Sequence, residues 1–444
     1  MATGLQRTFG TPTNNKIFTL SLWLKRAADN LGNTISLLTG GGSSRPSSEF
    51  VLNSEALALS QYDGLDYNYN VRAYYYARDV SAWYHIVYTF DSTQATASDR
   101  VKFYMNGVLQ NYNMQNTDYP SLNYVPAMNN ATNHAIGGNV YSGFSANAKC
   151  IMSHIHFIDG TAYDASAFGE TDATTGEWKI KTSPSVTYGN NGFFILKDGN
   201  SVTDQSGNGN NWTVGGGTLT KTEDCPDNVF ATLNPLDYSP NPATLQNGNT
   251  TYNKSSTGSG HNASMTGTLG AMTGKWYFEF KPTNTSSFVT GMIRTNHDLP
   301  NSQGYYATDA GCYAIANGSK IVGGSEQSQT VSYSANDIFG MAYDLDNGKF
   351  YFHVNGTYIN SGDPTSGSTG TGSLGDIALG SNIYVPFVSN ANYDQTNLIY
   401  FNFGNGYFGT TAVSSAGTNA SGIGIFEHDC PNGYTALSTK GLNL

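Results

Sequence analysis

Apolar and polar residues alternate with a period of two along most of the chain, in short runs that end at clusters of Gly, Asn, Asp and Ser. Such alternation places successive side chains on opposite faces of an extended strand, and the clusters supply turns. No segment keeps the 3.6-residue period of a helix, and SANAKCIMSHIHFI (145–158) also fits a strand better. The pattern predicts an all-β chain. The clearest predicted strands are IFTLSLWLKRA (17–27), WYHIVYTF (83–90), RVKFYMNGVLQNY (100–112), KWYFEFKP (275–282), KFYFHVNGTYI (349–359) and NLIYFNFG (397–404).

The alternation weakens in the middle of the chain. Two stretches there, DGNSVTDQSGNGNNWTVGGG and SPNPATLQNGNTTYNKSSTGSGHN, are rich in turn residues and poor in apolar ones, as linkers or covering loops are. Because 444 residues exceed what one hydrophobic core usually organises, we expect two units. The predicted division is a β-sandwich over 1–200, a turn-rich connector with a strap over 201–259, a second β-sandwich over 260–408, and a C-terminal tail with a strap over 409–444.

Two short segments echo one another. DCPDNVFATLN (224–234) and DCPNGYTALS (429–438) match with a single gap, and each follows one of the two predicted units. Pro with Asn or Gly sets a turn, and the aromatic residue and Leu after it could close the edge of a sandwich. We therefore expect each unit to carry a similar C-terminal strap.

Composition narrows the classes of function. Only 12% of the residues are charged, against the usual quarter, and the formal net charge is −11 with no Lys/Arg cluster to offset it. We therefore expect no nucleic-acid partner, on electrostatic grounds. The 30 Tyr and 22 Phe, with abundant Asn, Ser and Thr, instead suit glycans and hydrogen-bonded packing. The N-terminal MATGLQRTFGTPTNNK has no long apolar run, so we expect no signal peptide and no membrane insertion.

The four cysteines, Cys150, Cys225, Cys312 and Cys430, are widely spaced and form no Cys-x-x-Cys pair. This spacing excludes a zinc ribbon and a dense disulfide framework. It favours four free thiols in a protein made in a reducing cytoplasm.

The stretch MAYDLDNGKFYFHVNG (341–356) admits two interpretations. Asp344 and Asp346 stand two apart, as the first ligands of a calcium loop do, but Asn355 occupies the twelfth position, where an acidic ligand is required. The alternative is a β-hairpin, because Asn-Gly is the favoured pair for a type I′ turn and Asn347-Gly348 has aromatic strands on both sides. The hairpin explains more of the stretch.

A second stretch, DQSGNGN (204–210), also resembles the opening of a calcium loop. Asp204, Ser206 and Asn208 occupy alternate positions, but Gly215 stands where the acidic twelfth residue is required. We expect a turn built on the Asp side chain or, as the alternative, a weak calcium site with a single carboxylate. No other cofactor is predicted.

Enzymatic constellations are missing from the sequence. No Glu-x-Asp-x-x-Glu strand offers the paired carboxylates of a glycosidase, and FEHDC (426–430) lacks that spacing. His85 has no Gly-x-Ser-x-Gly nucleophile for a partner, so a packed strand histidine is expected. His154 and His156 share one strand face as two metal ligands would, but a third ligand is lacking. We expect a protein that is not an enzyme.

The densest cluster of Tyr, Asp and Asn is YDGLDYNYNVRAYYYARD (62–79). Sugar sites use aromatic faces against C–H groups and polar side chains for hydroxyls. The predicted glycan-binding residues are Asp63, Asp66, Tyr74, Tyr75 and Tyr76. The alternative is a strand whose tyrosines are half buried.

Each half of the chain resembles a known family. In the first half, three segments resemble the laminin-G-like, concanavalin-like sandwich: LSLWLKR (20–26), WYHIVYTFD (83–91) and DRVKFYMNGVLQ (99–110). In the second half, four segments resemble a SPRY-type sandwich: GKWYFEF (274–280), NDIFGMAYDLDNGKFYFHVNG (336–356), YVPFVS (384–389) and IYFNFG (399–404). The resemblances imply two consecutive β-sandwiches, a laminin-G/concanavalin-like jelly roll followed by a SPRY-like sandwich.

The order of the parts resembles virion proteins of tailed bacteriophages. The two sandwiches are accompanied by DQSGNGNNWT (204–213), ATLNPLD (231–237) and PNGYTALSTKGL (431–442). The resemblance implies a structural virion protein of a tail or head fibre or appendage, made in the bacterial host cytoplasm. It would form a homo-oligomer, with a trimer as the specific expectation, contact other virion proteins and bind host surface glycans. The alternatives are a decorative virion protein without a ligand and an extracellular glycan-degrading enzyme.

Overall fold

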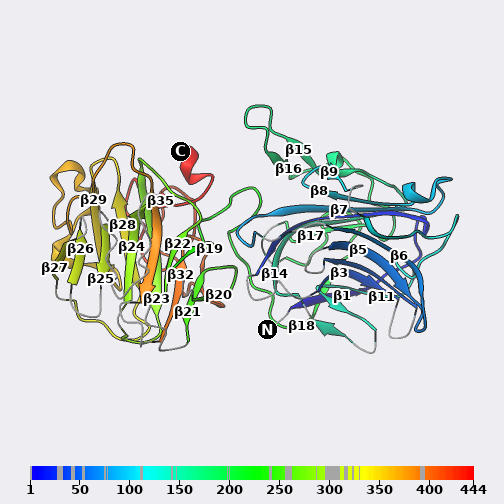
Figure 1. The fold of residues 1–444 in the computed structure, drawn as a ribbon, viewed down its shortest axis with the longest axis horizontal. Coiled ribbons are helices and arrows are strands. Elements are labelled where there is room, and N and C mark those ends of the chain that lie inside the picture. The colour runs from blue at the N-terminus through cyan, green and yellow to red at the C-terminus, as the bar shows by residue number, and fades with distance from the viewer. Residues whose placement is uncertain are drawn as a thin grey trace. The chain divides into compact units, whose positions relative to one another are not determined.

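The computed structural model describes residues 3–444 except 28–33, 42–45, 53–55, 75–76, 78, 111–113, 142–143, 147, 198, 200, 240–242, 256–262, 287, 296–310, 315–318, 323–324, 330 and 391–395. Contacts within the chain divide it into two units, Met1–Lys221 and Thr222–Leu444. Each unit is a β-sandwich made of two antiparallel sheets (Figure 1). The prediction of an all-β chain with two consecutive sandwiches is confirmed.

Unit 1 contains the larger sheet A and the smaller sheet B. Sheet A runs in the order β10 (Met114–Asp118), β6 (Tyr67–Tyr74), β5 (Ala56–Tyr62), β4 (Ser47–Leu52), β3 (Ile35–Gly40), β11 (Asn133–Ile136), β1 (Gly4–Thr8) and β18 (Thr213–Gly216). Sheet B runs in the order β17 (Phe193–Ile195), β14 (Cys150–Asp159), β2 (Ile17–Arg26), β7 (Tyr84–Asp91), β8 (Val101–Met105) and β9 (Val108–Leu109). Smaller elements are β12 (Gly138–Asn139), β13 (Ser145–Ala146), β15 (Gly169–Thr171), β16 (Trp178–Ile180), η2 (Ala97–Asp99) and η3 (Ala165–Ala167).

Alternate residues of β2 help to form the core of unit 1. Phe18, Leu20, Leu22 and Leu24 belong to the core between the two sheets. The intervening residues of β2 face outward, yet they are buried as well, because the segment after β14 folds back over this face of sheet B. Strand β2, in the middle of sheet B, is therefore buried on both faces.

Unit 2 contains sheets C and D. Sheet C runs in the order β19 (Leu233–Tyr238), β22 (Ser264–Gly267), β31 (Tyr384–Asn390), β24 (Phe288–Arg294), β25 (Gly311–Ala314), β26 (Ser319–Val322) and β27 (Ser325–Ser328). Sheet D runs in the order β20 (Thr244–Gln246), β21 (Thr251–Lys254), β32 (Asn397–Asn402), β23 (Lys275–Pro282), β28 (Phe339–Asp344), β29 (Lys349–Val354) and β30 (Thr357–Tyr358), and β35 (Thr435–Ala436) pairs in parallel with β23. The remaining elements are β33 (Tyr407–Phe408), β34 (Thr411–Ala412), η4 (Ile359–Ser361), η5 (Pro364–Thr369) and η6 (Gly441–Asn443).

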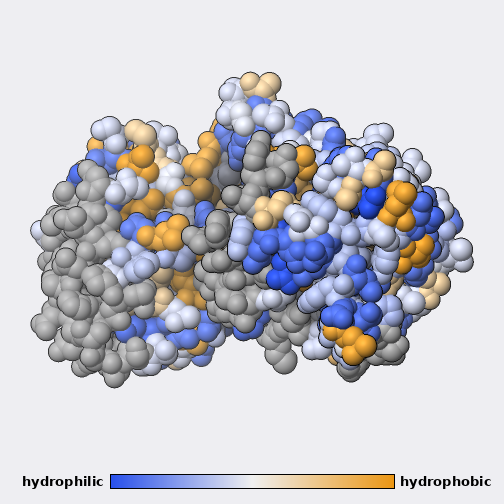
Figure 2. Space-filling model, turned by 45° about the vertical axis from the view of Figure 1, so that its right-hand side comes forward, coloured by the Kyte–Doolittle hydropathy of each residue, from blue (hydrophilic) through white to orange (hydrophobic). Residues whose placement is uncertain are grey.

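The helical elements of the described ranges are short 3-10 turns. None of them has the length and apolar character needed to cross a bilayer. On the face that Figure 2 shows, hydrophilic residues cover most of the described surface, and hydrophobic residues gather only in small patches. The low content of charged residues thus does not leave a broad apolar surface on this face.

The C-terminal tail covers the outer face of sheet D. Phe426, Cys430 and Tyr434 of the tail form one buried cluster with Tyr277 of β23 and Tyr351 of β29. Strand β23 is consequently buried on both faces along most of its length. Outward-facing positions of this strand are interior positions of the unit.

The two echoing segments lie together in unit 2. The N–H of Ala231 donates to the carbonyl of Leu437 at 2.8 Å, and the N–H of Thr439 donates to the carbonyl of Val229 at 2.9 Å. The structure thus differs from the expectation of one strap for each unit, because the two straps pair with each other. Residues 201–221 of the predicted connector belong to unit 1, and residues 222–259 belong to unit 2.

Strands β28 and β29 form the predicted hairpin, but its loop is longer than expected. Asp344 pairs directly with Lys349, so residues 345–348 form the loop. Of the expected turn pair, only Gly348 has a left-handed backbone, at φ +66°. A two-residue type I′ turn needs positive φ at both central residues, so that detail of the prediction is wrong.

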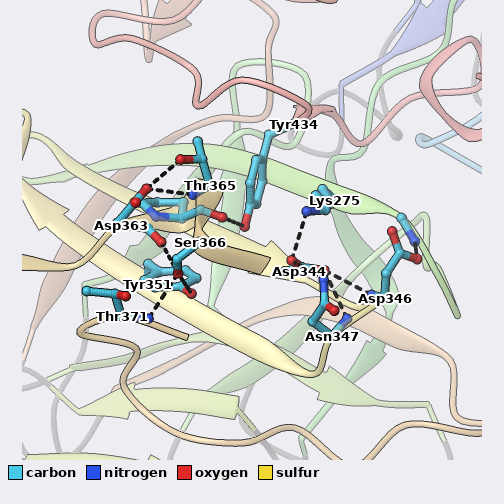
Figure 3. A network of polar contacts seen from close by, with 12 residues as sticks. Lys275, Asp344, Asp346, Asn347, Tyr351, Asp363, Thr365, Ser366, Thr371 and Tyr434 are labelled. Atoms are coloured by element: carbon cyan, nitrogen blue, oxygen red, sulfur yellow. Dashed lines mark hydrogen bonds and ion pairs between the residues drawn. The ribbon is translucent and has the colours of Figure 1, made fainter. Parts of the chain in front are cut away.

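The side chain of Asp344 holds this loop together (Figure 3). Its Oδ1 accepts hydrogen bonds from the N–H groups of Asp346 and Asn347 at 3.1 and 3.0 Å, and its Oδ2 lies 3.0 Å from Nζ of Lys275. Asp346 points elsewhere and accepts from the N–H of Gly274 at 2.7 Å. The two aspartates therefore serve different partners, as residues of a hairpin rather than of a calcium loop.

Candidate functional site

The exposed turn between β5 and β6 contains the predicted residues Asp63 and Asp66. Oδ1 of Asp63 accepts hydrogen bonds from the N–H groups of Leu65 and Asp66, both at 2.9 Å. These backbone donors, that of Asp66 first, hold the pKa of Asp63 below its usual value, so the carboxylate is ionised at neutral pH. The turn is thus preorganised and negatively charged.

Apolar and aromatic side chains flank this turn. Leu65 is 87% exposed and Tyr67 is 51% exposed. The rings of Tyr62 and Tyr67 lie 5.2 Å apart. We call residues 62–68 the β5–β6 rim. Among the described residues no hydrogen bond or ion pair engages the carboxylate of Asp66, so this side chain is available to a ligand.

Tyr124, in a neighbouring loop, connects to the residues at the base of the rim. Gln61 donates hydrogen bonds to Oη of Tyr124 at 2.6 Å and to Oδ1 of Asn68 at 3.3 Å. The ring of Tyr124 in turn packs edge-on against Tyr69, which is fully buried. The exposed residues of the rim therefore stand on a fixed base.

The five predicted glycan-binding residues do not form one cluster. Tyr74 ends β6, whereas Asp66 precedes its first residue, Tyr67. With a rise of about 3.3 Å per residue, Asp66 and Tyr74 are roughly 26 Å apart. Tyr75 and Tyr76 lie outside the described residues. Among the predicted residues that the structure describes, Asp63 and Asp66 lie beside the exposed Tyr67, and Tyr74 lies at the far end of the strand.

The loop at Asp204 is a turn built on a side chain. Oδ1 of Asp204 accepts from the N–H groups of Phe194 and Ser206 at 2.8 and 2.9 Å. Its Oδ2 accepts from the N–H of Asn210 and the hydroxyl of Ser206, both at 2.8 Å. Asn208 uses its side chain to donate to the carbonyls of Gly189 and Gly192. Four donors point at the carboxylate of Asp204, which favours the turn over the calcium alternative.

His85 occupies a buried position in sheet B and has a serine neighbour. Its Nε2 lies 2.9 Å from Oγ of Ser21, and its Nδ1 accepts a hydrogen bond from Nε1–H of Trp178 at 3.0 Å. Because the indole can only donate, Nδ1 carries no proton and Nε2 carries the proton of the neutral ring. Nε2 therefore cannot take the proton of Ser21, and burial lowers the pKa of His85 to about 3. The arrangement is structural.

His154 and His156 do not converge on a metal. His154 has a positive φ of +48° at an irregularity of β14, and its Nδ1 lies 2.7 Å from Oγ of Ser153. Nδ1 of His156 lies 2.9 Å from Oη of Tyr188. Among the described residues, no three His, Cys, Asp or Glu side chains are grouped to hold a metal ion.

Unit 2 contains a pocket that the sequence did not indicate. It has a volume of about 670 Å³, with one wall from residues 353–365 and the other from residues 415–431 of the tail. The described lining includes Asp363, Glu427 and Asp429. Asp363 is far from Glu427 and Asp429 in the sequence, so no local pattern of residues indicates the pocket.

Three buried polar side chains, those of Tyr277, Glu279 and His353, lie in sheet D next to this pocket. We call them the buried polar row. Glu279 of β23 and His353 of β29 lie opposite Gly340 of β28, on the face of sheet D that the tail covers. The hydroxyl of Tyr277 lies 3.1 Å from Oε1 of Glu279 and 2.7 Å from Nε2 of His353. Gly340 makes room for the imidazole, since a Cβ there would lie 1.9 Å from Nε2 of His353.

Burial governs the charge of this row. Removal from water raises the pKa of Glu279 to about 7, although four hydrogen-bond donors surround its carboxylate. The same effect lowers the pKa of His353 to about 3, so the imidazole is neutral at ordinary pH. We assign the row to holding the tail.

Parts of the chain are similar to known proteins. A search of curated proteins found none that matches it. Among solved structures, the SPRY domain of human HERC1 aligns at 15% identity with a TM-score of 0.29, covering 38% of this chain and 96% of that domain. The PSpry domain of TRIM65 aligns at 14% identity with a TM-score of 0.28, covering 39% and 91%.

A third solved structure is a carbohydrate-binding module. The CBM40 of the Ruminococcus gnavus IT-sialidase, bound to alpha2,3 sialyllactose, aligns at 17% identity with a TM-score of 0.24, covering 31% of this chain and 74% of the module. Likenesses of this degree carry no information about function. The match that bears on family is that of residues 5–149, less than half of the chain, to the model described as the Concanavalin A-like lectin/glucanases superfamily.

Proposed function

We propose that this chain is a carbohydrate-binding protein without enzymatic activity, and that the β5–β6 rim contacts the glycan. The observation that carries the proposal is the exposed Tyr67, 5.2 Å from the ring of Tyr62 and beside the ionised Asp63. Aromatic faces pack against the C–H groups of sugars, and carboxylates accept hydrogen bonds from their hydroxyls. The rim lies within residues 5–149, which match the lectin and glucanase superfamily.

Binding at one such rim is expected to be weak, because it is an open surface rather than a deep pocket. A homo-oligomer would present several rims together and convert weak contacts into avidity. A trimer is the specific proposal. The polar, sparsely charged surface is suited to hydrogen-bonded packing between copies.

The place of action that we propose is the virion of a tailed bacteriophage, on a tail or head fibre or appendage. Support comes from the order of sequence segments, in which a laminin-G-like part precedes ATLNPLD (231–237) and a SPRY-like part precedes PNGYTALSTKGL (431–442). The protein would be made in the host cytoplasm and would contact other virion proteins. Immunogold labelling of purified particles with an antibody to the chain tests this, and particles without label would overturn it.

Glycan binding is tested with the variant Tyr67→Ala. Tyr238→Ala is the matched control, because Tyr238 is similarly exposed, at 46%, but lies in unit 2. We expect the wild-type chain to bind host cells and selected spots of a glycan array, Tyr67→Ala to lose at least tenfold in apparent affinity, and Tyr238→Ala to bind as the wild type does. Binding to neither target, or equal binding by both variants, would contradict the proposal.

The absence of catalysis is tested separately. Host polysaccharide is incubated with the purified chain, and reducing ends are measured over time. We expect no release above the level of buffer. Release that a single Asp or Glu substitution abolishes would show a hydrolase, since glycoside hydrolysis depends on a pair of carboxyl groups.

A further inference from the structure

The β5–β6 rim contains negative charge and no positive charge. Residues 62–68 include the carboxylates of Asp63 and Asp66, and they include no Lys, Arg or His. Neither aspartate forms an ion pair with the residues that the structure describes. A ligand on the rim therefore meets two negative charges that no described cation offsets by direct contact.

The charge of Asp63 is fixed beside the aromatic pair. Its Oδ1 accepts from two backbone N–H groups of the turn, and its Oδ2 accepts from the side-chain amide of Asn68 at 3.3 Å. These three donors are neutral amides, so they stabilise the ionised form without cancelling its charge. The hydroxyl of Tyr62 donates to the carbonyl of Gly64 at 3.0 Å, which holds this tyrosine against the same turn. The carboxylate and the rings of Tyr62 and Tyr67 thus belong to one preorganised turn.

The electric field of Asp63 extends beyond the turn. Burial first, and the charge of Asp63 second, raise the pKa of Tyr124 at the base of the rim. Lys16 and Arg100 donate to oxygens of the loop that contains Tyr124, at 3.3 and 2.9 Å, and not to either rim carboxylate. The negative charge of the rim is therefore felt by its surroundings.

A sugar that packs against Tyr67 comes close to these charges, because Asp66 is the next residue in the chain. At physiological ionic strength, charges interact over about 8 Å before salt screens them. A carboxylate, sulfate or phosphate group on the sugar would be repelled over this range and would find no cationic donor among residues 62–68. A neutral sugar offers hydroxyl groups, which can donate to the carboxylate oxygens.

We propose that the rim binds uncharged glycans and rejects anionic ones, and that Asp63 and Asp66 set this selectivity. The inference rests on the proposed function, since it names the class of glycan that the same rim takes. It separates the rim from a site for acidic sugars, where a cationic side chain would pair with the charge of the ligand.

The test is a glycan array on which each neutral oligosaccharide stands beside its counterpart oxidised at the primary hydroxyls. Oxidation turns these CH₂OH groups into carboxylates and keeps the rest of each ring. We expect the full-length chain to bind neutral members of the array, with loss of binding in Tyr67→Ala, and to bind their oxidised counterparts at least tenfold more weakly. In 1 M sodium chloride, where the screening length falls to about 3 Å, most of this difference should disappear.

The variant Asp63→Asn/Asp66→Asn removes both charges, and an asparagine at position 63 keeps an oxygen for the N–H groups of the turn. Its ratio of affinities, neutral over oxidised, should fall to nearly one. The matched control is Asp337→Asn/Asp376→Asn, which removes two carboxylates from unit 2 and should keep the ratio of the wild type. This control separates the charge of the rim from the net charge of the chain.

The two proposals fail in different ways. Binding that depends on Tyr67 but is equally tight for oxidised and neutral glycans would overturn the selectivity and leave the proposed function standing. A ratio that Asp63→Asn/Asp66→Asn does not change, or that the control changes as much, would also overturn the selectivity alone. Binding to no member of the array, or binding that Tyr67→Ala does not weaken, would overturn the proposed function and this inference with it.

Discussion

The carboxylate of Glu279 accepts a hydrogen bond from the backbone N–H of His428 at 2.8 Å, across 149 positions of sequence. A second bond of the same length comes from the N–H of Glu427. Glu279 thus holds the tail by its backbone at the point where the tail forms the pocket wall. The consequence is that an ionisable group buried under the tail sets how firmly the wall is fixed.

The first prediction concerns the dependence of stability on pH. The folded pKa of Glu279, about 7, is above the value near 4.3 of an unfolded glutamate. Between these values the folded chain holds a proton that the unfolded chain has released, so stability falls as pH rises from about 4.5 to 7. Glu279→Gln lacks this loss and should gain about 3 kcal/mol on the wild type over that range.

Urea unfolding at several pH values between 4.5 and 8 measures this difference. The buried histidines titrate in both proteins, so their contribution cancels when the variant is compared with the wild type at each pH. The amide that replaces the carboxyl group fits imperfectly among the four donors, so we expect the unfolding free energies of the two proteins to differ by a constant amount at every pH. Only the change of this difference with pH reports the titration of Glu279. A difference that is flat over the whole range would contradict the prediction.

The second prediction concerns the glycine opposite His353. A Cβ at Gly340 would lie 1.9 Å from Nε2 of His353, whose ring is fully buried. Gly340→Ala should therefore destabilise unit 2 by about 1–3 kcal/mol, as overpacked cores are destabilised. Thermal unfolding of Gly340→Ala, His353→Ala and the double variant forms a cycle, in which the double variant should cost less than the sum of the single ones. Additive costs would show that the two positions do not meet.

The sequence was sufficient to predict the strands that have the clearest alternation. Strand β23 occupies Lys275–Pro282, as predicted, because apolar residues at every other position demand one buried face. The alternation cannot show what covers the opposite face. Glu279, the single acid of that strand, is therefore buried by a tail whose position depends on long-range packing.

The same effect of distance separates two of the predicted glycan-binding residues. Asp66 and Tyr74 are close in the sequence, but Asp66 precedes β6 and Tyr74 ends it, so the extended backbone carries them to opposite ends of the strand. The pocket shows the converse, because Asp363 and Asp429 line one cavity although 65 residues separate them in the numbering. The turns at Asp63 and Asp204, where neighbours in the sequence remain neighbours in space, could be located beforehand.

The third prediction separates two buried tyrosine hydroxyls. Oη of Tyr434 donates to the carbonyl of Pro364 at 2.9 Å, whereas Oη of Tyr358 has no partner among the described residues. Tyr434→Phe should therefore cost about 1–2 kcal/mol and loosen the tail, because it leaves a buried carbonyl unpaired. Tyr358→Phe should cost nothing or stabilise the chain slightly. Equal losses of unfolding free energy in the two variants would refute the assignment of their hydrogen bonds.

The last prediction concerns calcium. Oxygens of Asp204 accept four hydrogen bonds, and Asp344 accepts two from the backbone while it pairs with Lys275, so a cation would have to displace these donors. An ion that binds only the folded chain raises the melting temperature with its concentration. We expect the melting temperature to be the same in excess chelator and in millimolar calcium chloride. A rise that grows with calcium and disappears in Asp204→Asn would instead show that the loop at 204–210 binds the ion.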